Sequence, residues 1–384
     1  MFQLLDGGPQ FLVLLSEVFH SCTYGLFNPS SVFIEKLIDH LIVHILNMLS
    51  IYHVADIHIR DARRSELTAA IDLIAEHMEC DRTPTKIVVL AGDIFDAKTK
   101  LTALNVLDFS HMVEAFSRAS SLIVSMPGNH DMNLNNADSI DLIDPLTLNH
   151  DRLFHFVETG SYVLDDLPTV AFNVVSPADQ VLTYPYNEHT HLNFLLAHEN
   201  VSGVLHNGTR LAGRIHPSNF DKYDAVFLGH IHECTFIGSN AAYSGSTIQQ
   251  TVGESYIKGY VRWTVAGNVV RKDFVPLPNM YAFLKVTLTD SGRMYNTHPM
   301  FQELDEQCRP TKPTRTIVEN QSSTPYDGIE FPHAEVVVKA PKTRDNVAPL
   351  TNCTAQLVQF MHEHKMPETL QSEILELHNQ YAKE

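Results

Sequence analysis

Five short segments of this chain carry side chains of the types that bind divalent metal ions. They are Asp56-Ile57-His58, Gly92-Asp93, Gly128-Asn129-His130-Asp131, the single His198, and Gly229-His230-Ile231-His232. Carboxylate, imidazole and amide groups without a thiolate suit Mn, Fe or Zn better than a softer metal. Each segment alone is common by chance, but five of them in this order, most at the end of an apolar run, predict one metal centre.

Such a centre suits the hydrolysis of phosphate esters. That reaction requires the phosphate charge to be neutralised, a hydroxide to form near neutral pH, and the leaving alkoxide to be protonated. Two divalent ions about 3.5–4 Å apart perform the first two tasks together. They need one carboxylate that contacts both, and Asp93, on a glycine turn between the other segments, is the natural bridge.

The segments lie where predicted strands end. Apolar runs at 51–55, 86–91, 122–126, 192–197 and 225–228 each stop at one of them, and helical periodicity occupies 66–78 and 101–118. Continuous apolar strands separated by helices indicate an α/β sheet that is covered on both faces. Sites in such sheets form where strands give way to loops.

This series of segments resembles the motifs of the calcineurin-like metallophosphoesterases over about residues 51–250. The resemblance implies a sandwich of two sheets flanked by helices, α/β/β/α, and two divalent ions, Mn first, with Fe, Zn or Mg as alternatives. One ion would be held by Asp56, His58, Asp93 and His232, and the other by Asp93, Asn129, His198 and His230. A hydroxide between the ions would attack phosphorus. His130 would contact the scissile phosphate and assist the leaving oxygen, with Asp131 orienting His130.

Within this family the chain resembles the DNA-repair exonuclease branch, the SbcD-type nucleases of double-strand-break repair that partner a coiled-coil ABC-type ATPase. The resemblance rests on residues 51–58, 92–96 and 243–250, and phage and large-virus relatives are similar around 246–254. The branch usually has a histidine, associated with nuclease activity, where this chain has Asp96. The resemblance implies an exonuclease subunit. A phosphatase or phosphodiesterase for a nucleotide or other small phosphoester, and a non-catalytic DNA-end scaffold, stay open as alternatives.

The net charge of −18 is unfavourable for binding DNA. Arg60, Arg63 and Arg64 follow the first segment and could contact backbone phosphates, although a solvated helix start explains them equally well. We therefore expect weak, salt-dependent DNA binding, with the ATPase partner supplying further contacts. A homodimer is an alternative assembly.

Four regions are expected along the chain. They are an apolar helical extension at 1–49, the phosphoesterase domain at 50–275, a small capping region at 276–345, and a helical tail at 346–384. The extension either packs on the domain or contacts a partner or membrane surface, and Met48 is an alternative start. The tail either packs on the chain itself or docks on the ATPase. In the capping region we expect strands at 281–288 and 335–340 and a loop at 305–330.

Five scattered cysteines without paired spacing predict reduced thiols in an intracellular protein. No apolar run reaches the roughly 18 residues of a membrane-spanning helix, so no transmembrane segment is expected. No convincing secretory signal begins the chain.

Overall fold

The computed structural model describes residues 48–134, 141–206, 209–267, 269–324, 326–328, 330–331, 333–338 and 371. The helical extension expected before Met48 and, apart from Gln371, the helical tail expected at 346–384 lie outside the described residues. Within the described part, no helix is long and apolar enough to cross a membrane.

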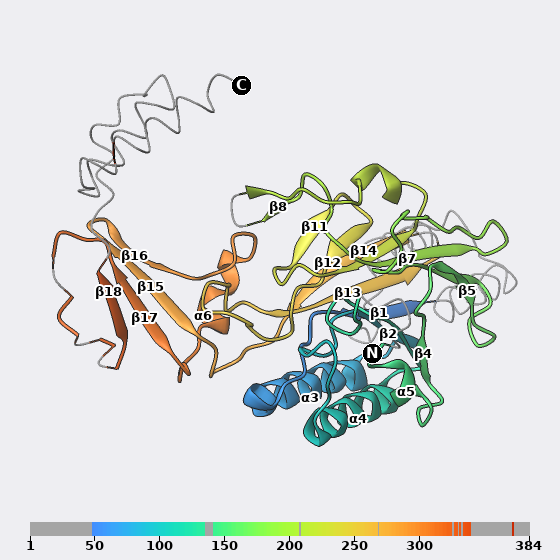
Figure 1. Ribbon diagram of the computed structural model, residues 1–384, viewed down its shortest axis with the longest axis horizontal. Helices are drawn as coiled ribbons and strands as arrows, with labels where there is room; N and C mark the ends of the chain where they lie inside the picture. Colours follow the sequence, from blue (N-terminus) through green and yellow to red (C-terminus); the bar gives the residue numbers. More distant parts are fainter. Residues whose placement is uncertain are drawn as a thin grey trace, which may run out of the picture.

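Two six-stranded sheets form the body of the protein (Figure 1). The first has the order β14-β13-β1-β2-β3-β4, with β1 at Leu49–Val54, β2 at Thr85–Ala91, β3 at Leu122–Met126, β4 at Leu153–His155, β13 at Gly259–Ala266 and β14 at Val269–Pro276. The second has the order β11-β12-β10-β7-β6-β5, with β5 at Gly160–Val163, β6 at Val170–Val175, β7 at Leu192–His198, β10 at Ala225–Gly229, β11 at Thr235–Ile237 and β12 at Ala241–Tyr243. In the first sheet β1, β2, β3 and β4 run parallel to one another, and in the second β6, β7, β10 and β12 do so. The outer strands β13, β5 and β11 pair with β1, β6 and β12 in the antiparallel sense.

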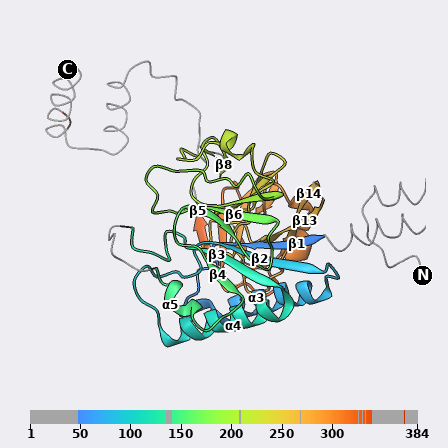
Figure 2. The ribbon, with the colours of Figure 1, turned by 90° about the vertical axis from the view of Figure 1, so that its right-hand side faces the viewer.

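Alternating side chains of the buried strands serve two hydrophobic cores. Ile51 and Val89 face the core between the two sheets, where they meet Phe172, Phe194 and Phe227. The next residues along the same strands point to the other face of the first sheet, because strand side chains alternate. There they pack against α3 (Arg64–Cys80) and α4 (Ala103–Ala119), as the layers in Figure 2 show.

The outer face of the second sheet is covered differently. A third core there joins the strands to the connection between β7 and β10, whose buried side chains include Val201, Ile215 and Phe220. The described part of this connection contains the short strands β8 (Leu205–His206) and β9 (Thr209–Arg210) and the 3-10 turn η2 (Pro217–Phe220), but no α-helix. The predicted α/β sandwich is therefore confirmed, with a second outer layer made mainly of loop.

A small four-stranded sheet lies beside this body (Figure 1). Its order is β16-β15-β17-β18, with β15 at Leu284–Thr289, β16 at Gly292–Tyr295, β17 at Thr316–Asn320 and β18 at Glu335–Val338, and α6 (Asp305–Cys308) precedes β17. The prediction of a loop over 305–330 is wrong for the residues of β17. This strand pairs in parallel with both β15 and β18. The β-branched residues Thr316, Ile317 and Val318 favour a strand, and Val318 is buried despite the polar residues around it.

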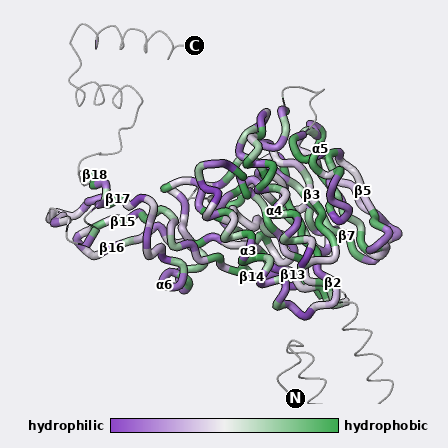
Figure 3. Tube along the Cα trace, turned by 90° about the horizontal axis from the view of Figure 1, so that it is seen from below, coloured by the Kyte–Doolittle hydropathy of each residue, from purple (hydrophilic) through white to green (hydrophobic). Residues whose placement is uncertain are grey.

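In the larger body, hydrophobic segments, green in Figure 3, gather around α4, β3 and β7.

Candidate metal centre

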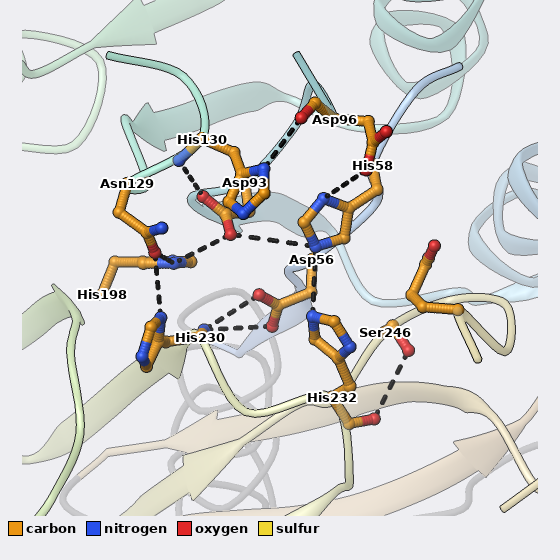
Figure 4. A network of polar contacts seen from close by, with 12 residues as sticks. Asp56, His58, Asp93, Asp96, Asn129, His130, His198, His230, His232 and Ser246 are labelled. Atoms are coloured by element: carbon orange, nitrogen blue, oxygen red, sulfur yellow. Dashed lines mark hydrogen bonds and ion pairs between the residues drawn. The ribbon is translucent and has the colours of Figure 1, made fainter. Parts of the chain in front are cut away.

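The predicted ligands all follow the carboxyl ends of buried strands. Asp56 and His58 follow β1, Asp93 follows β2, and Asn129 follows β3. His198 ends β7, and His230 and His232 follow β10 in the second sheet. Because β1–β3 run parallel to one another, as do β7 and β10, their ends bring the side chains to one place, where they point toward one another in Figure 4.

Tight turns make this convergence possible. Asp56, His58 and Asp93 have φ of 51° and His230 has φ of 94°, in the left-handed region that non-glycine residues seldom adopt. A Cβ atom on Gly128 would lie 2.1 Å from Oδ1 of Asp93, so this position requires glycine. Left-handed backbone at four ligand positions is the kind of strain that the surrounding fold maintains at functional sites.

One group of ligands contains Asp56, His58 and His232, whose ligating atoms lie within 4.8 Å of one another. Nε2 of His58 and Nε2 of His232 are 3.1 Å apart. His232 donates Nδ1–H to Oε1 of Glu254 over 3.1 Å, so Nε2 is the ring nitrogen that faces His58. Two nitrogens at about 2.0–2.1 Å from one ion, at a right angle, are separated by about 3 Å. The observed spacing fits a shared cation.

The second group contains Asp93, Asn129, His198 and His230. Nδ1 of His198 donates to the carbonyl oxygen of Ala91 over 2.8 Å, so Nε2 is the ring nitrogen that is free to bind a metal ion. This Nε2 lies 3.2 Å from Oδ1 of Asn129 and 3.3 Å from Oδ2 of Asp93. A proton on Nε2 or a bound cation stabilises this arrangement, because burial makes an unpaired carboxylate charge costly. His230 adds Nδ1, 2.9 Å from the same Asn129 oxygen.

Asp93 lies between the two groups. Its Oδ2 is 3.3 Å from Nε2 of His198 and 3.8 Å from Nε2 of His58, while Oδ1 accepts the backbone N–H of His130 over 2.7 Å. One carboxylate therefore reaches both sets of ligands. This is the position that a metal-bridging residue occupies in a two-metal site.

The electrostatics of the centre suit cation binding. Burial lowers the pKa of His58 to about 3 and the pKa of His230 to about 4, which keeps both imidazoles in the neutral form that ligates metal. Burial acts to raise the pKa of Asp93, but the charge and hydrogen bond of His198 outweigh it and hold that pKa well below its usual range. Burial opposes a charge on His198, yet Asp93 and then Asp56 raise its pKa to about 9. These carboxylates draw positive charge to this point.

Comparison with known proteins agrees with this geometry. Residues 49–234 match the family model for the calcineurin-like phosphoesterases. This part of the chain is a calcineurin-like phosphoesterase domain. Over 367 residues the chain is 26% identical to an uncharacterized protein of Acanthamoeba polyphaga mimivirus, an alignment that covers 85% of the chain and 26% of the viral protein. The chain thus spans about a quarter of the length of this curated relative. The family match bears out the expected family for residues 49–234, and a viral protein is among the relatives.

A supporting residue that the sequence did not reveal lies beyond the matched residues 49–234. Glu254 accepts from Nδ1 of His232, and its Oε2 lies 3.0 Å from Nζ of Lys258 and accepts from the backbone N–H of Gln250 over 2.9 Å. A carboxylate behind a ligating histidine fixes the ring orientation and makes the ligating nitrogen more basic. Glu254 lies 22 residues beyond His232 in a loop, and no spacing pattern marks it.

His130 and Asp131 have different surroundings from those expected. The His130 ring lies edge-on to His58 with ring centroids 5.0 Å apart, and its Nδ1 is 2.8 Å from the backbone carbonyl oxygen of Asp96. Asp131 was expected to orient His130, but its buried carboxylate accepts backbone N–H groups of Ile94, Phe95 and Gly128. Asp131 thus ties the loop after β2 to the loop after β3, and a main-chain oxygen holds the ring instead.

Two of the three arginines are already engaged. Arg63 is buried, pairs with Glu66, donates to the carbonyl of Gln249 and lies over the ring of Phe283 at 4.6 Å. Arg64 makes a two-pronged contact with Asp108 at 2.6 and 2.7 Å. Carboxylates thus hold both guanidinium groups, and the expected contact of either arginine with a phosphate stays a prediction.

Arg60 is the arginine that stays near the centre. Its contact with Oδ1 of Asp96 is loose, at 3.5 Å, and the same oxygen lies 3.6 Å from Nδ1 of His58. The Asp96 side chain is 42% exposed, so a carboxylate stands at the open side of the ligand cluster. Any phosphate that approaches on this side meets Asp96 as well as Arg60.

Proposed function

We propose that the chain is a two-metal phosphodiesterase, and specifically a DNA repair or recombination exonuclease subunit that hydrolyses DNA phosphodiester bonds. One observation carries the proposal: two sets of ligands share Asp93, with His130 held beside them. Membership of residues 49–234 in the phosphoesterase family supports the hydrolase chemistry. The motif resemblance to the SbcD-type branch supports the DNA substrate and a coiled-coil ABC-type ATPase as partner in an intracellular complex.

Each part of the centre has a role in this reaction. When bound, divalent ions, for which Mn is our first choice, neutralise phosphate charge and supply hydroxide near neutral pH. Asp56, His58 and His232 would hold one ion, Asn129, His198 and His230 the other, and Asp93 both. His130 gives Nδ1–H to the carbonyl of Asp96, which holds the ring in place so that Nε2 can donate a proton to the leaving oxygen.

A second candidate is hydrolysis of a nucleotide or another small phosphoester. Asp96 at the open side of the centre favours it, because this carboxylate repels an extended polyanion more than a small substrate that fits past it. The pairing of Arg63 and Arg64 with carboxylates also favours it, because the phosphates of DNA would compete with Glu66 and Asp108 for these guanidinium groups. A non-catalytic DNA-end scaffold is the third candidate, and the test below distinguishes it.

The test compares two substrates with the metal-depleted chain and added Mn²⁺. Release of nucleotides from linear duplex DNA, lost in His130→Ala, supports the exonuclease. Hydrolysis of bis(p-nitrophenyl) phosphate without nucleotide release supports the small-phosphoester enzyme. Binding of Mn²⁺ without turnover of either substrate, with and without a co-expressed ATPase partner, supports the scaffold. Asp96→His, which restores the residue usual in the nuclease branch, should raise DNA cleavage relative to the small diester.

A further inference from the structure

The loops that follow β1 and β2 are joined by main-chain hydrogen bonds. The N–H of His58 donates to the carbonyl of Asp93 over 3.0 Å, and the N–H of Ile59 donates to the carbonyl of Ile94 over 2.8 Å. The N–H of Asp96 in turn donates to the carbonyl of Ile59 over 3.3 Å. These bonds hold the backbone of Asp96 beside that of the metal-site histidine.

One ring nitrogen of His58 has no hydrogen-bond partner. His58 is 4% exposed, and its Nε2 faces His232 in the first group of ligands. Its Nδ1 makes no hydrogen bond with any residue that the structure describes. Buried polar atoms without partners are rare in native proteins and call for an explanation. A carboxylate lies close by, because Oδ1 of Asp96 is 3.6 Å from this Nδ1 (Figure 4).

A metal ion at Nε2 decides where the ring hydrogen of His58 must be. A neutral imidazole has one N–H and one lone pair, so a ring that binds metal through Nε2 carries its hydrogen on Nδ1. That N–H would be a buried donor, and leaving it unpaired weakens the site. Histidines that bind metal almost always donate this hydrogen to a carboxylate, a carbonyl or water, which fixes the ring and makes the ligating nitrogen more basic.

The Asp96 carboxylate is able to close the remaining gap. Its distance of 3.6 Å from Nδ1 of His58 is longer than a hydrogen bond. A shift of about 0.4–0.9 Å would bring the two atoms within the usual 2.7–3.2 Å. The Asp96 side chain is 42% exposed, and its contact with Arg60 is loose at 3.5 Å, so the carboxylate has room for this rotation.

We propose that Asp96 is a positioning residue for His58, and that its carboxylate accepts Nδ1–H when Nε2 holds a metal ion. Glu254 has this relation to His232, so each histidine of the first group has its own carboxylate. The inference rests on the metal centre of the proposed function, but it does not depend on which phosphoester is hydrolysed.

A direct bond from Asp96 to a further metal ion is the alternative. His58, Asp96 and His130 offer ligand atoms within 4.8 Å of one another. An ion among these three would have to bind Nδ1 of His58 while the first ion binds Nε2, and the ring would then keep no hydrogen. The hydrogen bond to Asp96 leaves the ring neutral and is therefore favoured.

The proposal is tested by calorimetric titration of the metal-depleted full chain with Mn²⁺. Asp96→Asn keeps the size of the side chain and removes its charge, and it should weaken one of two Mn²⁺ sites about tenfold or more. This should be the site that Glu254→Gln weakens, so the double variant should keep the other site at its original affinity. Asp72→Asn is the matched control, because Asp72 is 53% exposed and contacts His111, outside the metal centre, at 2.8 Å. It should leave both affinities unchanged.

A second measurement observes the hydrogen bond itself. In the chain loaded with diamagnetic Zn²⁺ and labelled with ¹⁵N-histidine, Nδ1–H of His58 should give a downfield proton signal. Asp96→Asn should move this signal upfield, whereas Asp72→Asn should not.

Three results would overturn the proposal. They are an Asp96→Asn variant with both Mn²⁺ affinities unchanged, an equal loss at both sites, as removal of a distant charge would cause, and a third Mn²⁺ that binds the original chain and is lost in the variant. If the original chain binds no Mn²⁺, the proposed function fails as well. If it binds two and Asp96→Asn has no effect, the role of Asp96 fails alone.

Discussion

Replacing Glu254 by glutamine should weaken one metal site and spare the other. Glu254 accepts Nδ1–H of His232 over 3.1 Å and is 3.0 Å from Lys258. Burial acts to raise its pKa, but these contacts, with the hydrogen bond from His232 the largest, lower it to about 2, so a full negative charge stands behind the ring. Loss of such a partner typically lowers metal affinity 10–100-fold, or about 1.4–2.7 kcal/mol. The free energy of Mn²⁺ binding at the site that contains His232 should weaken by this amount.

The assay is calorimetric titration of the metal-depleted chain with Mn²⁺. Two binding events are expected, and in Glu254→Gln one of them should weaken while the other, which rests on Asn129, His198 and His230, should not. Glu335→Gln is the control. It removes an exposed carboxylate on β18 that pairs with Arg315, and it should leave both Mn²⁺ affinities unchanged. If Glu254→Gln weakens both sites equally, or neither, the assignment of His232 to one ion with Glu254 behind it is refuted.

The remaining predictions concern turnover, backbone space and pH. His130→Ala should lower phosphodiester hydrolysis by about 10²–10⁴-fold while two Mn²⁺ still bind, and an unchanged rate would contradict the role of its ring. Gly128→Ala should weaken both metal sites in the same titration, because its Cβ would lie 2.1 Å from Oδ1 of the shared Asp93, whereas Gly253→Ala, whose nearest atom would be at 3.9 Å, should be silent. Burial lowers the pKa of His53 from 6.5 to about 3, so as pH falls the unfolded chain takes up a proton that the folded chain refuses, and stability falls. From about pH 7 to about pH 5, His53 should lower the free energy of unfolding by about 2 kcal/mol, measured by urea denaturation. If the free energy of unfolding of a His53→Leu variant depends on pH as steeply, this role of His53 is contradicted.

The parts of the fold and site that the sequence predicts well depend on local pattern. Apolar runs that stop at Asp56, Asp93 and His198 locate both the strands and the ligands, because the end of a buried strand is where the chain reaches the edge of the sheet. The convergence of β7 and β10 with β1–β3 follows from the same rule applied to two sheets. The motif order supplied the remaining ligand assignments.

The parts that the sequence does not predict depend on contacts between distant segments. Glu254 lies in a loop and contacts His232, and the guanidinium of Arg63 lies over the ring of Phe283 near the start of the small sheet. Asp131 follows His130 in the chain, yet the turn directs its carboxylate to the loop after β2. The strand β17 is short, and its neighbours in sequence are polar. Its extended conformation therefore depends on its pairing with β15 and β18. Tertiary context overrides local signals in each case.

The shared role of Asp93 is tested most directly by anomalous diffraction from crystals of the chain grown with Mn²⁺. The account predicts two peaks separated by about 3.5–4 Å, one beside Asp56, His58 and His232, the other beside Asn129, His198 and His230, and both in contact with the Asp93 carboxylate. A single peak, or two peaks of which one does not touch Asp93, would contradict it.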